Sequence, residues 1–281
     1  MKLQLVAPRQ GAAWVRRAFQ VFGRQPLGFA ALFAACLFVF LLLGFVPLVG
    51  TIALLVLPPF GSLLFMIASR RVGEGRAAMP GAIVELVSAG RARLLSLLKL
   101  GIAYATATFV VFWLAGVLDG GAVEAFLDSL ASAKTGGESA AARVADPQLQ
   151  FGLILRLLFA GALSVPFWHA PALVHWGGQG WAKSLFFSSV ALWRNKGAFT
   201  VYGLVWMALW LVLIAIVSIG VGVFGPERFT LVATPLTLVF STVFYASLWF
   251  TFADCFAPAA PASAPPRDDG SPSDSLTKGS P

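Results

Sequence analysis

The stretch QPLGFAALFAACLFVFLLLGFVPLVGTIALLVLPPFGSLLFMIAS, residues 25–69, carries no charged side chain. The hydrocarbon core of a bilayer is about 30 Å thick and is crossed by roughly 20 apolar helical residues, so this stretch is too long for one crossing. Pro47-Leu48-Val49-Gly50 lies near its middle, and helices usually end before a proline. The stretch therefore predicts two membrane-spanning helices, about 27–46 and 51–69, with Pro58-Pro59 bending the second.

The composition of the whole chain agrees with a membrane protein. Of its 281 residues, 58% are hydrophobic and 11% are charged, and the mean hydropathy is +0.84. A soluble domain is about 45–50% apolar and about 25% charged. These values exclude a soluble enzyme and a disordered protein, and two cysteines are too few for a disulfide-stapled secreted domain.

Further apolar stretches predict the remaining spans, which are 100–118, 151–175, 198–224 and 229–253. We therefore expect an all-α, polytopic membrane domain of six transmembrane helices over residues 1–256, with 119–150 as an outer loop. Residues 257–281 are rich in Pro, Ala, Ser and Asp. Such a segment lacks the apolar content needed to fold, so it is predicted to be a disordered cytoplasmic tail.

Basic residues set the predicted orientation. The N-terminal segment and the connections that follow the second and fourth spans are rich in Arg and Lys, whereas 119–150 holds more acidic than basic residues. Cytoplasmic loops carry an excess of Lys and Arg, so both termini are predicted to lie in the cytoplasm. The same rule accounts for the net charge of +8, and the sequence has no module typical of nucleic-acid binding.

The outer loop is expected to contain a short helix, because four of its apolar residues recur at helical spacing: Val123, Phe126, Leu127 and Leu130. Asp146 and Pro147 are expected to cap the fourth span. Arg156 lies about two turns inside that span, and we expect its side chain to extend outward to the polar headgroups.

Amphipathic segments precede the odd-numbered spans. At 100° per residue, Trp14, Val15 and Ala18 fall on one side of a helix and the neighbouring arginines on the other. The segments 80–98 and 181–196 have a similar pattern, which is typical of helices that lie in the headgroup plane. The residues predicted to contact lipid headgroups are Arg16, Arg17, Arg24, Arg91, Arg93, Arg194 and Lys196.

Polar side chains inside the spans indicate a second kind of site. His169 lies deep in the fourth span, where an ionisable group points to function; the alternative is a neutral histidine bonded to a carbonyl that Pro166 or Pro171 leaves free. Hydroxyl groups of the sixth span fall within an arc of about 80° and should face the bundle, either to line a polar pathway or to bond to another helix. The candidate pathway residues are His169, Thr234, Thr237, Ser241 and Tyr245.

Motifs for catalysis or cofactor binding are missing. GVGVFG, residues 220–225, has the spacing of a dinucleotide-binding loop, but it ends a membrane helix and does not join a strand to a helix. His169 and His175 would lie about 240° apart on a regular helix, and His175 with Trp176 is expected in an interfacial belt. We predict no catalytic residue, no metal and no cofactor, and a protein that is not an enzyme.

A weak three-fold repeat relates the segments that precede the odd-numbered spans; the alternative is the positive-inside rule acting three times. The third copy, from Arg93 onward, matches less well than the other two. Phe22-x-Arg24-Gln25-Pro26-x-x-Phe29 aligns with Leu192-x-Arg194-Asn195-Lys196-x-x-Phe199. With Trp14, Pro171 and Trp193, these residues make the chain, over about 10–255, resemble an uncharacterised proteobacterial inner-membrane protein family. It is also similar, more remotely, to the six-helix membrane domain fused to some glycerophosphodiester phosphodiesterases. The phosphodiesterase activity belongs to a soluble domain outside that resemblance, which therefore implies the bacterial inner membrane and no activity.

The sequence thus favours a non-enzymatic role in handling or sensing lipid, or in supporting envelope assembly, because the basic amphipathic segments suit anionic headgroups. The alternative is a passive or facilitated small-molecule transporter that uses the polar stripe of the sixth span. The expected partners are anionic membrane lipids and no nucleic acid. A protein partner or a second copy of the chain is left open.

Overall fold

The computed structural model describes residues 2–131 and 146–257, and the predicted tail beyond 257 lies outside them. The described chain is helical apart from two short strands, β1 (Lys2–Leu3) and β2 (Phe256–Ala257). The helices are α1 Gln10–Arg24, α2 Pro26–Gly44, α3 Val49–Val56, α4 Pro58–Gly73, α5 Gly81–Val87, α6 Arg91–Leu118, α7 Ala122–Ala131, α9 Pro147–Phe167, α10 Ala170–His175, α11 Trp181–Arg194, α12 Lys196–Phe224 and α13 Pro226–Cys255.

Five helical segments are long and apolar enough to cross a membrane: α2, α6, α9 with α10, α12 and α13. A sixth candidate is the pair α3 and α4, which is bent by 44° at Leu57, directly before Pro58-Pro59. A proline lacks the backbone N–H that continues a helix, which explains the bend at this position. The described chain therefore holds five membrane spans, or six if the bent pair is one span.

One prediction is wrong: the segment 80–98 is not one interfacial helix, because α5 ends at Val87 and α6 already begins at Arg91. The fourth span runs over Pro147–His175 and breaks at Trp168 and His169, just after Pro166, between α9 and α10. The Ser188 hydroxyl accepts a hydrogen bond from the His169 N–H and donates one to the Val165 carbonyl, both at 3.0 Å, so this side chain satisfies backbone groups at the break.

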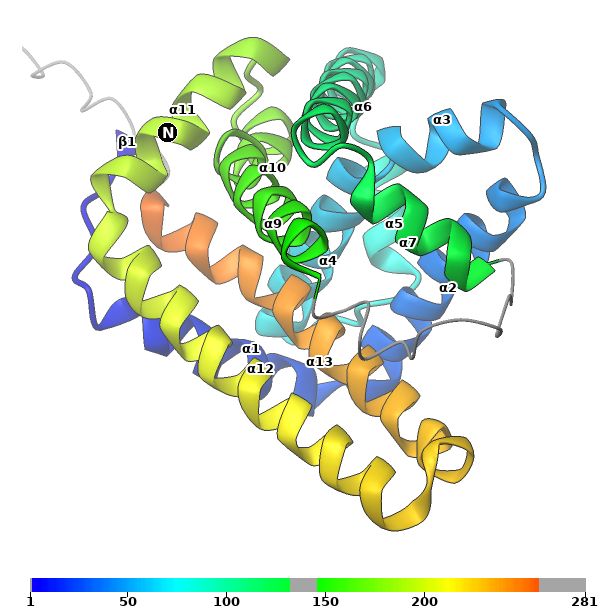
Figure 1. The fold of residues 1–281 in the computed structure, drawn as a ribbon. Coiled ribbons are helices and arrows are strands. Elements are labelled where there is room, and N and C mark those ends of the chain that lie inside the picture. The colour runs from blue at the N-terminus through cyan, green and yellow to red at the C-terminus, as the bar shows by residue number, and fades with distance from the viewer. Residues whose placement is uncertain (1, 132–145, 258–281) are drawn as a thin grey trace, which may run out of the picture.

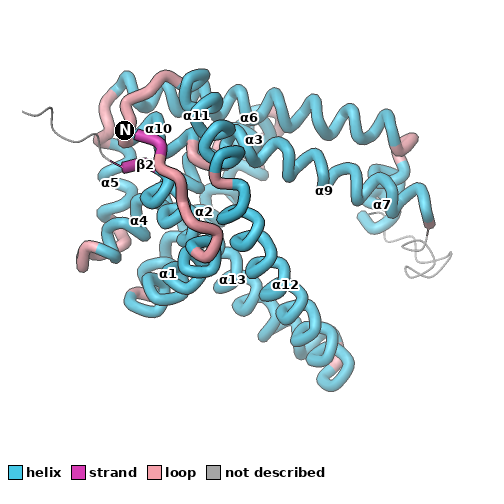
Figure 2. The backbone as a smooth tube through the Cα atoms, turned by 90° about the vertical axis from the view of Figure 1, so that its left-hand side faces the viewer, coloured by secondary structure: helices cyan, strands magenta, loops and turns pink. Residues whose placement is uncertain are grey.

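The helices form two long hairpins that spread apart from a shared core. Figure 2 shows α6 and α9, with α7 at their far end, running away from α12 and α13, while α1, α4 and α10 lie where the hairpins meet. We name the end of the bundle that carries α1, α5 and α11 the basic end, because exposed arginines gather there. Most of the buried apolar side chains, from Trp14 to Phe252, form one cluster around this end.

Helix α1 is part of the core and does not merely rest on the membrane surface. Figure 1 shows it in blue beside α12 and α13. Trp14 and Ala18 are completely buried, whereas Arg16 is exposed on the opposite face. At Gly11 a Cβ atom would lie 2.6 Å from the backbone nitrogen of Tyr202, so only glycine lets α1 approach α12 this closely.

One carboxylate attaches α1 to the last helix. Asp254 accepts hydrogen bonds from Gln10 Nε2 and Trp14 Nε1, both at 2.8 Å, and forms an ion pair with Arg17. The Arg17 guanidinium also lies 5.0 Å from the centre of the Phe250 ring. Arg17 was predicted to contact lipid headgroups, but its partner is Asp254. Because Asp254 lies under α1, it is not the ordinary solvated residue that its position at a span edge suggests.

The two ends of the described chain pair with each other. Lys2 and Leu3 face Ala257 and Phe256 in an antiparallel ladder. Asn195, at the junction of α11 and α12, accepts from the Val6 N–H at 2.8 Å and donates to the Gln4 carbonyl at 3.0 Å. The segment before α1 and the end of α13 are therefore held on the same side of the bundle.

Gln25, the residue that aligns with Asn195 in the sequence repeat, has the same role at the other junction. It separates α1 from α2, accepts from the Ala78 N–H at 3.0 Å and donates to the Arg76 carbonyl at 3.1 Å. In both places an amide between an amphipathic helix and a long apolar helix binds the backbone of a separate segment. The repeat is therefore structural at these two junctions.

Replacing Asp254 by Ala should lower the free energy of unfolding by about 1–2 kcal/mol, because three donors lose their acceptor in a site that is only partly open to water. The measurement is the midpoint of thermal unfolding of the detergent-solubilised chain. Arg16→Ala, one residue from Arg17 but exposed, is the control and should leave the midpoint unchanged. An Asp254→Ala midpoint equal to that of the control would contradict the anchoring role.

Candidate functional site

The cations that were predicted to meet lipid divide into two groups. Six of them are exposed on the basic end: Arg16, Arg24, Arg91, Arg93, Arg194 and Lys196. Arg93 also lies at the wall of a small polar pocket beside α5, whereas Arg17 is paired with Asp254. The exposed group is therefore the one that the fold leaves available to headgroups.

An apolar groove lies beside one of these cations, Lys196. It has a volume of about 640 Å³ and runs between α11 and α12, with Val165 of α9 at its base. The residues that line it are Val165, Phe186, Ser189, Val190, Leu192, Trp193, Lys196, Phe199 and Thr200. Lys196 is the one charged side chain among them, so the groove is apolar with a cation at one border.

Aromatic residues form the open side of this groove. Trp193 is 76% exposed and Phe186 is 63% exposed, although both belong to a helix with a buried opposite face. The Lys196 ammonium lies 5.6 Å from the centre of the Trp193 ring, a distance at which a cation and a ring attract. Exposed aromatic side chains next to cations are typical of helices at the boundary between headgroups and acyl chains.

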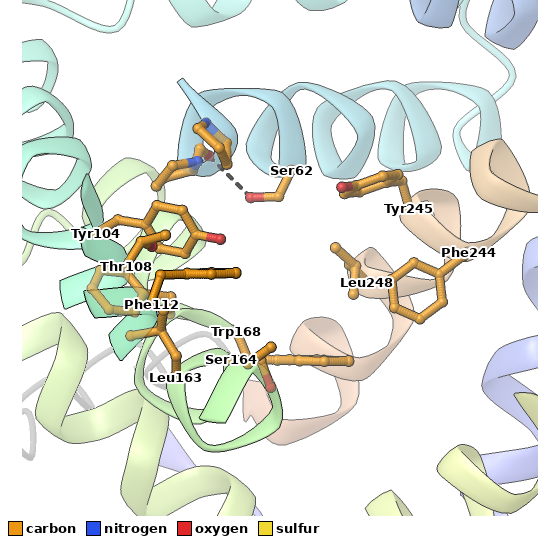
Figure 3. Close-up of a pocket in the computed structure, with 14 residues that line it drawn as sticks. Ser62, Tyr104, Thr108, Phe112, Leu163, Ser164, Trp168, Phe244, Tyr245 and Leu248 are labelled. Carbon is orange, nitrogen blue, oxygen red and sulfur yellow. Dashed lines mark hydrogen bonds between the residues drawn. The ribbon is translucent and has the colours of Figure 1, made fainter. Parts of the chain in front are cut away.

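A second cavity, of about 300 Å³, lies where the two hairpins part. Its walls come from α4, α6, α9 and α13. Figure 3 shows Tyr104, Thr108 and Phe112 on one side and Tyr245, Phe244 and Leu248 on the other. Of the five predicted pathway residues, only Tyr245 lines this cavity.

Two of the five hydroxyl groups in the cavity are already bonded within their own helices. Ser62 donates to the Pro59 carbonyl at 3.0 Å and Ser164 to the Gly161 carbonyl at 2.7 Å. The Thr108 hydroxyl differs, because it is buried and has no hydrogen-bond partner among the described residues. Thr108, Tyr104 and Tyr245 are therefore the groups through which the cavity could hold a polar ligand.

The hydroxyl stripe of the sixth span does not face the bundle, contrary to prediction. Thr234 and Thr237 are exposed and Ser241 is half-buried. The Thr237 hydroxyl donates to the Ala233 carbonyl of its own helix at 2.9 Å. The prediction is wrong because the outer part of α13 projects from the core together with α12 (Figure 2). The residues of this part of α13 therefore contact few other helices.

His169 is completely buried, but it lines none of the cavities described above. Its Nε2 atom lies 3.2 Å from the Thr251 hydroxyl, which also accepts from Trp168 Nε1 at 3.2 Å. The partner is thus a side chain of α13, and not the backbone carbonyl that the sequence suggested. Phe199, Phe252 and Phe256 surround the ring, so the histidine joins α9, α10 and α13 within the core.

The end of the bundle opposite the basic end is held by buried ions. Arg156 pairs with Asp119, which is completely buried, and with Glu124 at 2.5 Å. At Gly152 a Cβ atom would lie 2.8 Å from a methyl group of Val123 and would also meet the Asp119 carboxylate, so glycine leaves room for the pair. Arg156 was predicted to extend outward, but it is drawn to the two carboxylates of the α6–α7 corner.

The cap of α9 and the helix of the outer loop agree with the sequence. Asp146 accepts a hydrogen bond from the Gln148 N–H at 3.0 Å, with Pro147 in the first position of the helix. Helix α7 covers the apolar repeat of the outer loop. Both predictions are confirmed, because a helix cap and a helical repeat of apolar residues depend on neighbouring residues only.

The comparisons with known proteins identify a relative over almost the whole chain. A probable inner membrane protein of Burkholderia thailandensis is 31% identical over 265 residues, which cover 94% of this chain and 97% of the relative. The two chains belong to one family. With its long apolar helices, this member is a multi-pass protein of the inner membrane. No family model and no solved structure matches the chain.

Sequence reasoning found Tyr245, Lys196 and Arg93 but missed the other residues of this family member that line its cavities. Tyr104 and Thr108 are four residues apart in an apolar span, so they share one face of α6, and this spacing was the available signal. The groove between α11 and α12 left no comparable signal, because its residues have the same apolar character as the lipid-facing surface.

Proposed function

We propose that the chain crosses the inner membrane six times, with both ends in the cytoplasm. The pairing of Lys2 and Leu3 with β2 supports this count, because ends on one side require an even number of crossings. The exposed arginines of the basic end support the orientation, since cytoplasmic connections are basic. The proposal also includes the remote similarity to the six-helix membrane domain fused to some glycerophosphodiester phosphodiesterases, because that similarity implies the same number of spans.

Within this topology the protein is a non-enzymatic binder of anionic phospholipid. The observation that carries the proposal is the apolar groove between α11 and α12, which has Lys196 at its border. An acyl chain in the groove would cover Val190 and Phe199, which otherwise leave apolar surface beside the headgroups. Covering such surface is favourable by roughly 25 cal/mol per Å².

Charge selects the headgroup in this proposal. Lys196 and Arg194 are both exposed near the groove, and neither forms an ion pair with any described residue. A lipid phosphate there would gain roughly 1 kcal/mol for each nearby cation. A zwitterionic headgroup would gain less, because its own ammonium is repelled by the same side chains.

Lys196→Gln should reduce the number of anionic lipids that co-purify with the protein from native membranes, as counted by native mass spectrometry in mild detergent. We expect phosphatidylglycerol to be lost and phosphatidylethanolamine to be unchanged, because only the anionic headgroup depends on the ammonium. Lys183→Gln is a matched control, since Lys183 is also exposed on α11 and also lies over an aromatic ring, Phe187, at 5.8 Å, but does not line the groove. Equal lipid retention in the two variants would remove this proposal.

A second candidate function is passive or facilitated transport of a small molecule. The cavity of about 300 Å³ between the hairpins favours it, because carriers place their sites near the middle of the membrane beside broken helices. The cavity is bordered by the bend at Pro58 and lies next to the break before α10. The transported compound would then pass along α6 and Tyr245, and not along the outer part of α13.

Transport through this cavity predicts different results for two sets of variants. Thr108→Val with Tyr245→Phe should strongly reduce uptake of the transported compound into proteoliposomes, because the cavity then loses two of its three unbonded hydroxyl groups. Thr234→Val with Thr237→Val, on the exposed stripe, should leave uptake unchanged. The reverse pattern would support the stripe and contradict the cavity.

A further inference from the structure

We propose that a polar pocket at the basic end, separate from the groove, binds a phosphate group. The pocket has a volume of about 290 Å³ and is enclosed by α4, the end of α5, the first turn of α6 and α10. Its lining residues are Arg70, Glu85, Ser88, Ala89, Arg93, His175 and Trp176. The volume is near the lower limit of small-ligand pockets, so it suits a compact group.

The first argument is the balance of charge around the pocket. Glu85 is the carboxylate in its wall, and it lies 2.7 Å from Arg70, 3.8 Å from Arg71 and 3.5 Å from His175 Nε2. Arg71 lies outside the wall, and Arg70 also approaches Glu74, outside the wall, at 3.8 Å. The wall itself holds two arginines, Arg70 and Arg93, against the one carboxylate. The pocket therefore keeps a positive charge after its internal ion pairs are formed.

The second argument is a set of buried polar atoms without partners. His175 is only 5% exposed, so its ring is packed within the protein. Its Nδ1 atom and the Nε1–H of Trp176 have no hydrogen-bond partner among the described residues. Leaving a buried polar group unbonded is unfavourable, so two of them in one wall indicate a ligand that bonds to both.

These atoms suit a phosphate better than a carboxylate ligand. Trp176 Nε1 can only donate a hydrogen bond, and therefore needs an acceptor oxygen. With its proton on Nε2, toward Glu85, His175 accepts at Nδ1 and needs a hydroxyl, such as the P–OH of a phosphate or a hydroxyl of a headgroup. A phosphate group or its ester offers acceptor oxygens and a hydroxyl in one compact unit.

The third argument is that Arg93 is available to bind a ligand. Arg93 makes no hydrogen bond or ion pair to any described residue, although its side chain lines the pocket. A guanidinium binds a phosphate through two parallel N–H···O bonds. Arg70 cannot supply this contact freely, because it is bonded to Glu85 and lies 5.3 Å over the Trp176 ring.

The test uses the full chain in detergent and two probes, because a phosphate can come from a free anion or from a lipid headgroup. Inorganic phosphate is titrated calorimetrically at constant ionic strength. Separately, the chain is placed in nanodiscs of phosphatidylcholine with and without phosphatidylglycerol, and bound phosphatidylglycerol is counted by native mass spectrometry. Arg93→Gln is compared with Arg91→Gln, an exposed arginine of the same turn outside the pocket.

Arg93→Gln should weaken binding on the order of tenfold, since a charge-assisted bidentate contact is lost, and Arg93→Lys should restore part of it. Loss of inorganic phosphate binding identifies a free anion, whereas loss of phosphatidylglycerol alone identifies a headgroup; both results support the site. The proposal is overturned if Arg93→Gln and Arg91→Gln bind both probes equally. Lys196→Gln, run in parallel, separates this pocket from the groove, because it should affect lipid retention and leave inorganic phosphate binding unchanged.

Discussion

The contact of Asp254 with α1 is the constraint on which the rest of the structure depends. It attaches the first helix to the last through Gln10, Trp14 and Arg17. With α1 fixed across α12 and α13, the segment before it reaches Asn195 and pairs with β2. The basic end is therefore a packed layer whose remaining cations are exposed, and this layer holds two hairpins that are free to diverge beyond it (Figure 2).

The divergence of the hairpins explains where ligand-sized spaces occur. The apolar cavity lies where α9 and α13 part, and the groove lies where α11 turns into α12. The phosphate pocket lies within the packed layer itself, between α4 and α10. Two apolar spaces and one charged pocket thus follow from one arrangement, and the charged one is at the end where the described chain concentrates its arginines. This distribution is the basis of the proposal that the protein binds lipid headgroups on one side of the membrane.

Local signals in the sequence predicted much of the fold. Apolar length located the long helices, Pro58-Pro59 located a bend, and Asp146 with Pro147 located a cap, because each depends on neighbouring residues. Tertiary pairings could not be predicted in this way. Nothing local distinguishes Arg17, which pairs with Asp254, from Arg16, which is exposed one residue away. The same holds for Arg156 and for His175, whose carboxylate partners come from other segments of the chain. The prediction that Thr234 faces the bundle was wrong because helical periodicity shows which residues share a face, but not which segment that face contacts.

The most direct test of this account is the side of the membrane on which the basic end lies. Single cysteines are placed at Arg16, Arg194 and Ala125, which are exposed, in a background of Cys36→Ser and Cys255→Ser, and spheroplasts are treated with a membrane-impermeant maleimide. The account predicts that Ala125→Cys on α7 is labelled at once, whereas Arg16→Cys and Arg194→Cys are labelled only after the membrane is permeabilised. Labelling of either arginine position in intact spheroplasts would contradict it, because the packed layer formed by α1 and α11 could not then face the cytoplasm.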